Sequence, residues 1–199
     1  MTKPLYLILL LTIALLACQS PDPKISAAEK NYPDVPNAIR MAIQNNLEEQ
    51  LKLVKKVNTN GSVEEQTFQT DSTKFYEEMS LLLQYDLNKP AYRGVFDIEK
   101  NIDADGNEIV TLTAKESESP NIISAQFTSR NQQLLHANWI VKDQNYVYHS
   151  ERVFNISFAE INNRIILDNY HIAIGQKIIA QDSVWYTVDA KFSKNKLKS

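Results

Sequence analysis

The sequence predicts an α+β protein in which two N-terminal amphipathic helices pack on a curved antiparallel β-meander of about seven strands. Between residues 39 and 87, apolar residues recur every three or four positions, which is typical of helices that bury one face. From residue 92 onward apolar and polar residues alternate, which is typical of strands with one buried face. Because the helices precede the strands instead of alternating with them, α+β is the expected class.

The first helix is expected to begin at Asn37, whose side chain is a good N-cap. Lysines and glutamates fill one side of the segment, and Asn58 to Gly61 should end it. The other side is an apolar stripe made by Ile39, Ala42, Ile43, Leu47, Leu51, Val54 and Val57.

The second helix should begin at Asp71 or Ser72 and end before Asn88-Lys89-Pro90, because the residue before proline disfavours helix. The stretch between the helices, Val63 to Gln69, is interpreted as either a short strand or a loop. The apolar side of the second helix comprises Phe75, Tyr76, Met79, Leu82, Leu83 and Leu87.

Strands are expected after Tyr92, with turns at Asp105-Gly106, Lys142–Asn145 and Gln181-Asp182. Most of these strands carry a single apolar face, which favours a meander with the helices on that face. Their expected ranges are 92–99, 110–114, 122–130, 133–142, 145–158, 164–179 and 183–192.

The turn at Lys142–Asn145 predicts one hairpin in detail. It places Trp139 opposite Tyr148 on a buried face. On the other face it places His136 opposite Glu151, and Asn138 opposite His149. Such a group could bind a metal ion or serve acid–base chemistry, but the polar side of a half-exposed sheet is the simpler and favoured interpretation.

A second register hypothesis concerns Gly175. Pairing Ile179 with Val184 in a regular ladder would place Ile174 opposite Asp189. One extra residue near Gly175 places Ile174 opposite Val188 instead, which predicts a β-bulge there. Glycine is a favoured bulge residue because it accepts positive φ.

Length, charge and cysteine content exclude several classes of protein. A chain of 199 residues is expected to form one domain. The net charge of -3 argues against a nucleic-acid partner. A single cysteine excludes an intramolecular disulfide and a zinc finger.

The N-terminus has the layout of a secretory signal peptide: Lys3, an apolar run from Leu5 to Ala17, and then polar residues. The end of the run, Leu15-Leu16-Ala17-Cys18, resembles the lipobox of bacterial lipoproteins. This resemblance implies cleavage before Cys18 and covalent lipid on its thiol and amino group. It therefore implies a membrane partner through the lipid anchor.

Three regions follow from these features. Residues 1–17 are interpreted as the cleaved signal peptide, and residues 18–36 as the lipidated cysteine with a tether containing four prolines. Residues 37–199 are the expected single α+β domain. The expected location is the bacterial cell envelope, on the periplasmic or surface face of the outer membrane.

The chain contains no nucleophile elbow, no zinc-protease motif and no glycine-rich phosphate loop. No cofactor is expected beyond the lipid on Cys18, and neither a catalytic residue nor a metal site is assigned. The sequence therefore favours a non-catalytic binding or assembly module for an apolar small molecule or lipid, a glycan or an envelope protein. The alternative is a metal-dependent or His/Glu-based hydrolase that uses the 136–151 hairpin, with His136, His149 and Glu151 as candidates.

Overall fold

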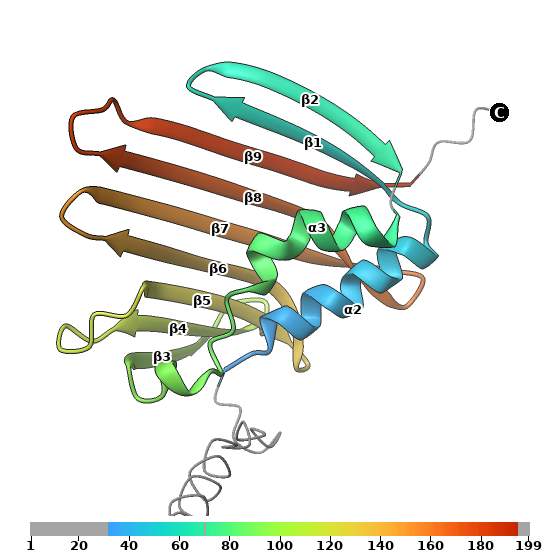
Figure 1. Cartoon of the computed structure of the whole chain (residues 1–199). Coiled ribbons are helices and arrows are strands. Elements are labelled where there is room, and N and C mark those ends of the chain that lie inside the picture. The colour runs from blue at the N-terminus through green and yellow to red at the C-terminus, as the bar shows by residue number, and fades with distance from the viewer. Residues whose placement is uncertain (1–31, 70, 195–199) are drawn as a thin grey trace, which may run out of the picture. The chain divides into compact units, whose positions relative to one another are not determined.

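The structure, a computed structural model, describes residues 32–69 and 71–194 (Figure 1). These residues belong to one compact unit that begins at Tyr32. The expected signal peptide and Cys18 lie outside the described residues. Among the residues that are described, no helix is long and apolar enough to cross a membrane.

Nine antiparallel strands form a single sheet, and two α-helices lie on one of its faces (Figure 1). We call this the helix face and its opposite the outer face. The order of elements is α2 (Val35–Glu48), β1 (Lys52–Thr59), β2 (Ser62–Gln69), α3 (Ser72–Leu83), the short 3-10 helix η2 (Pro90–Tyr92), β3 (Phe96–Ile102), β4 (Glu108–Ala114), β5 (Ile122–Arg130), β6 (Gln133–Gln144), β7 (Tyr148–Ile161), β8 (Arg164–Ile178) and β9 (Val184–Ser193).

The strand order across the sheet is β2-β1-β9-β8-β7-β6-β5-β4-β3. Strands β3 to β9 follow one another as a meander, and the β1–β2 hairpin extends the sheet beyond β9. Strand β1 pairs with β9 along its whole length, from Lys52 opposite Ser193 to Thr59 opposite Tyr186. The first and last strands of the described chain are therefore neighbours inside the sheet.

The predicted fold class is wrong in the number of strands and in the position of the helices. The sheet has nine strands, and a β-hairpin separates the two helices. Helix α2 ends at Glu48, and Gln50 adopts a left-handed backbone with φ of 51°. The residues from Lys52 to Val57, which were expected to continue the helix, belong to β1 instead.

The turn after β1 and the packing of β1 on β9 explain why this segment is a strand. Asn60 and Gly61 both have positive φ, 48° and 91°, as a tight hairpin turn that matches strand twist requires. On the helix face Leu53 of β1 lies opposite Phe192 of β9, and both are buried. Burial against β9 therefore outweighs the helical spacing of this segment.

The second helix begins where it was predicted, but it ends at Leu83, before Leu87, and Tyr76 on its expected apolar side is exposed. The Asp71 side chain caps it by accepting a hydrogen bond from the Lys74 N–H at 3.0 Å. Phe75, Met79 and Leu82 are fully buried, and the ring of Phe75 stacks on Phe192 with centroids 5.2 Å apart. This contact packs helix α3 on β9.

The predicted register of the β6–β7 hairpin is wrong. Strand β6 continues to Gln144, and the turn forms around Asn145, whose Oδ1 accepts hydrogen bonds from the N–H groups of Val147 and Tyr148 at 2.9 Å. Trp139 consequently lies opposite Phe154 instead of Tyr148. The shift is an even number of residues, so Trp139 still faces inward and is buried.

The predicted bulge at Gly175 is also absent. The β8–β9 ladder runs unbroken through Gly175, which lies opposite Trp185, with Ile174 opposite Tyr186. The connection from Ile178 to Val184 is longer than expected, so the apolar faces align without an extra residue. A bulge does occur earlier in β8, where Ser157 pairs with Asn169 and Phe158 pairs with Leu167, so that Asp168 is the extra residue.

Candidate ligand-binding site

The candidate residues from the sequence do not form one cluster. His136 lies opposite Ser157, with Nδ1 3.1 Å from the hydroxyl oxygen. Glu151 lies opposite Lys142 and forms an ion pair with it at 3.1 Å. The expected pairing of His136 with Glu151 is therefore wrong, because it depended on the shorter hairpin.

His149 and Glu151 do share the outer face of β7, two residues apart. They line a shallow hollow of about 210 Å³ together with Gly175 and Trp185. In the part of the chain that the structure describes, no three His, Cys, Asp or Glu side chains come together as a metal site would require. Cys18, the predicted lipidation site, is outside that part.

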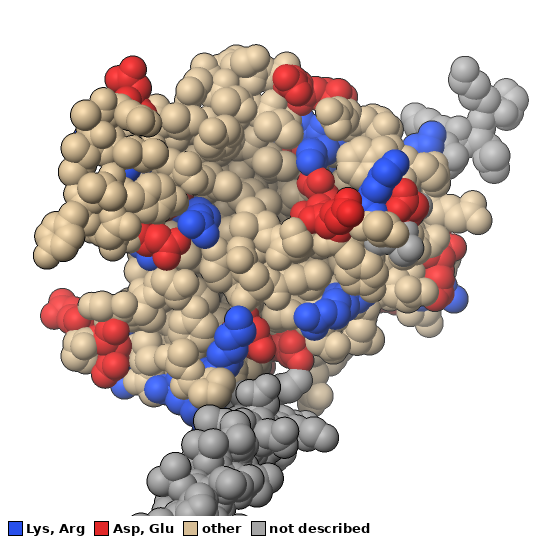
Figure 2. Space-filling view, viewed as in Figure 1, with Lys and Arg blue, Asp and Glu red and all other residues tan. Residues whose placement is uncertain are grey.

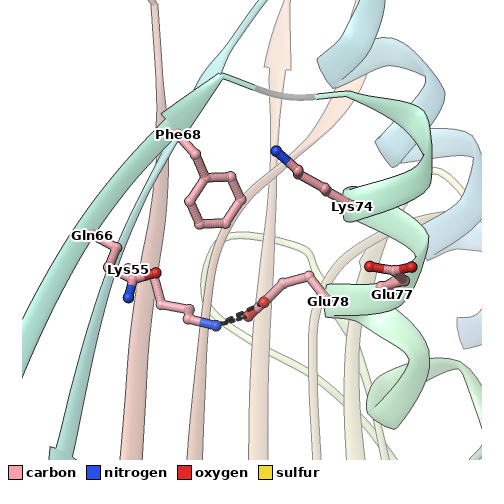
Figure 3. A pocket seen from close by; sticks show the side chains of 6 residues that line it. All are labelled: Lys55, Gln66, Phe68, Lys74, Glu77 and Glu78. Atoms are coloured by element: carbon pink, nitrogen blue, oxygen red, sulfur yellow. Dashed lines mark hydrogen bonds and ion pairs between the residues drawn. The ribbon is translucent and has the colours of Figure 1, made fainter.

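A larger pocket of about 470 Å³ lies on the helix face, between the β1–β2 hairpin and α3 (Figure 3). We call it the α3 pocket. Strand side chains enter it from one side and helix side chains from the other, so the hairpin that interrupts the two helices creates it. Its lining consists of Lys55, Gln66, Phe68, Lys74, Glu77 and Glu78.

An ion pair crosses the floor of this pocket (Figure 3). The Lys55 ammonium donates to both carboxylate oxygens of Glu78, at 2.8 and 2.7 Å, and both side chains are about four-fifths buried. The hydroxyl of Tyr170 donates to the same carboxylate at 2.6 Å. Burial, and then this neighbouring carboxylate, raise the pKa of Tyr170 far above its usual range.

Charges of both signs surround the pocket. Lys74 and Glu77 of α3 add a second cation and a second carboxylate to the pair on the floor. In the space-filling view, acidic and basic side chains lie side by side over this part of the molecule (Figure 2). Such a lining complements a polar group that carries a positive and a negative charge.

The sheet beside the α3 pocket carries half-buried apolar side chains on its helix face. Val57 follows Lys55 by two residues on β1 and lies opposite Val188, which lies opposite Ile172 on β8. Helices α2 and α3 do not extend over this end of the strands (Figure 1). We call the partly exposed residues here the apolar band: Val57, Ile174, Val184, Tyr186 and Val188.

Sequence reasoning missed this site. Lys55 was assigned to the polar side of a helix, and Glu78 was not singled out. The available signal was the Asn60-Gly61 pair, a dipeptide that favours a two-residue hairpin turn. That interpretation would have placed Lys55, Val57 and Phe68 on a strand pair, although not against α3.

Comparisons with protein-family models, with curated proteins and with solved structures find no match for this chain.

Proposed function

We propose that the protein is a lipid-anchored binding module of the bacterial cell envelope that binds an amphiphilic lipid without chemical change. The observation that carries this proposal is the position of the charged α3 pocket beside the apolar band. The pocket suits the head group, and the band suits an acyl chain. Apolar surface with a few convergent polar groups is the usual composition of a small-molecule site.

The lining of the pocket favours a zwitterionic head group. A phosphate would accept hydrogen bonds from Lys74 and Lys55, and an ammonium group would be held by Glu77 and Glu78. Because the Lys55–Glu78 pair is already formed, neither charge is buried without a partner before the ligand binds, which avoids a large desolvation penalty.

The lipid anchor is the second part of the proposal. It is supported by the lipobox-like Leu15-Leu16-Ala17-Cys18 after an apolar run. Several acyl chains on one cysteine hold a protein stably at a membrane, because each buried CH₂ contributes roughly 0.8 kcal/mol. A bilayer would then lie close to a domain that binds a lipid.

The ligand is tested with residues 19–199, which include all of the buried core between Tyr32 and Phe192. The probe is a fluorescent monoacyl phosphatidylethanolamine, held below its critical micelle concentration. We expect saturable binding that Val188→Asp weakens at least tenfold. The matched control is Thr187→Asp, because Thr187 is the adjacent residue on β9 and faces outward.

Circular dichroism must show that both variants fold. If Val188→Asp does not, Tyr186→Ser takes its place, since it removes apolar area without adding a charge. Binding that is unaffected by helix-face changes, or no binding at all, would contradict the proposed ligand.

The anchor is tested separately in the full chain. Cys18→Ser should abolish labelling by a palmitate analogue and leave the precursor uncleaved. Equal labelling of the two proteins would contradict lipidation at Cys18 without bearing on the ligand.

A further inference from the structure

Large apolar side chains gather at one end of the sheet, where the β6–β7 and β8–β9 hairpins turn. Among the described residues, ten large hydrophobic side chains are exposed, and five of them lie here. We call these five residues the tip patch: Tyr146 (99% exposed), Val147 (57%), Ile178 (42%), Ile179 (63%) and Trp185 (63%).

The two turns are joined to each other. The N–H of Ile179 donates to the carbonyl of Val147 at 3.0 Å. Asn145 holds its own turn closed by accepting from the Val147 and Tyr148 N–H groups. The hairpin ends are therefore held side by side at one end of the sheet, where the structure places both (Figure 1).

These side chains contribute little to the core, although the ring of Trp185 covers Gly175 on the outer face. A fully exposed tyrosine at the apex of a tight turn adds nothing to the core, and exposed apolar clusters of this kind mark interaction sites. Leaving five such side chains exposed to water is unfavourable, and covering them would be favourable in proportion to the apolar area removed from water.

We propose that the tip patch inserts into the interfacial layer of a phospholipid bilayer. Tyrosine and tryptophan, each with an apolar ring and a polar group, are enriched at that depth of membranes. Val147, Ile178 and Ile179 supply the apolar area between them, and Lys177 lies next to them with a charge that suits lipid phosphate. One exposed acidic residue, Asp182, lies in the β8–β9 turn, so the apolar side chains and not the net charge of the turn carry the proposed contact.

The choice of a bilayer over a protein partner rests on the proposed lipid anchor. From Cys18 to Tyr32 the chain can span at most about 50 Å, so an anchored domain stays within reach of the membrane. A bilayer is therefore present at high effective concentration, and weak insertion of a few side chains is enough to orient the domain.

The test uses residues 19–199, which carry no lipid, and vesicles of phosphatidylethanolamine and phosphatidylglycerol. Co-sedimentation should show binding that the triple variant Tyr146→Ser/Val147→Ser/Ile179→Ser weakens at least tenfold. The matched control, Ile98→Ser/Ile102→Ser, removes comparably exposed side chains from the edge strand β3 (50% and 77% exposed) and should bind as the wild type does.

A second readout locates the contact. In a Trp139→Phe background Trp185 is the only tryptophan, and brominated lipid should quench its emission and shift it to shorter wavelength. Absence of quenching, or equal loss of binding in the control variant, would overturn the proposal. So would a dimer that forms through the tip patch without vesicle binding, because the occupant would then be a second copy.

The vesicle-binding test of the tip patch can be distinguished from the test of the proposed lipid ligand. The triple variant leaves the α3 pocket and the apolar band intact, so it should still bind the monoacyl lipid probe. Loss of vesicle binding with retained probe binding supports the tip patch and agrees with the lipid site. Retained vesicle binding with retained probe binding contradicts the tip patch alone, and loss of probe binding in this variant contradicts the placement of the lipid site on the helix face.

Discussion

At the scale of single residues, the two tryptophans differ most clearly in their exposure to solvent. Trp139 is 2% exposed and stacks on Phe154 with centroids 5.0 Å apart, whereas Trp185 is 63% exposed. Trp139→Ala should therefore lower the free energy of unfolding by about 3–5 kcal/mol, because it leaves a large cavity. Trp185→Ala should change it by about 0.5 kcal/mol or less. Urea unfolding of the two variants checks this, and similar losses would mean that the faces of β6 or β9 are misassigned.

The reason that position 175 is a glycine is not visible in the sequence. A Cβ at this position would lie 2.5 Å from the ring of Trp185, which covers the glycine on the outer face. The sequence indicated that a side chain was excluded, and the inference chosen was positive φ. Cross-strand contact with an aromatic ring explains the same residue, and that contact depends on a register that local sequence does not define.

At the scale of elements, Asn46 connects α2 to the sheet. It is fully buried; its side-chain N–H donates to the Leu167 carbonyl at 2.8 Å, and its oxygen accepts from the Leu167 N–H at 2.9 Å. Leu167 flanks the bulge in β8, so the asparagine satisfies backbone groups beside the point where the ladder is irregular.

Asn46→Ala should lower the free energy of unfolding by about 2–4 kcal/mol, because two buried backbone groups lose their partners at roughly 1–3 kcal/mol each. Gln44→Ala on the exposed side of the same helix is the control and should cost less than about 0.5 kcal/mol. Chemical denaturation of both variants checks the difference. A loss for Asn46→Ala as small as that of the control would show that α2 is not held to β8 by this residue.

Periodicity predicted the individual elements better than their pairing. Helix α3 and strands β5 to β9 lie close to their expected ranges, because each has a consistent apolar face. The segment around β1 was assigned to a helix because Leu51, Val54 and Val57 are spaced three residues apart, as on a helical stripe, although in the strand Val54 and Val57 lie on opposite faces. Which structure forms is decided by pairing with β9, more than a hundred residues away, and no local pattern contains that information.

At the scale of the whole molecule, the pairing of β1 with β9 also creates the candidate site. It brings Lys55 under α3 and places Val57 beside Val188. None of these juxtapositions follows from short-range spacing, so the α3 pocket could not be predicted. The tip patch was likewise not predicted, because the expected strand 145–158 included Tyr146, whereas Tyr146 lies in the turn between β6 and β7.

The buried tyrosine under the pocket predicts how stability depends on pH. The pKa of Tyr170 is raised in the folded protein, so its contribution is fully present below the unfolded pKa near 10 and is lost as pH rises above it. The free energy of unfolding should fall above about pH 10, with Tyr170 contributing about 1.4 kcal/mol per pH unit. Urea titrations between about pH 9 and about pH 11 should give a shallower slope for Tyr170→Phe, and equal slopes would contradict the buried, protonated tyrosine.

The central claim, that a lipid lies along the helix face, is tested most directly by methyl NMR during a titration with monoacyl phosphatidylethanolamine. The account predicts that the methyl signals of Val57, Ile174 and Val188 shift together and saturate, while those of Val54 and Val153 on the outer face stay unchanged. Shifts confined to the outer face, or no saturable shift in the apolar band, would contradict it.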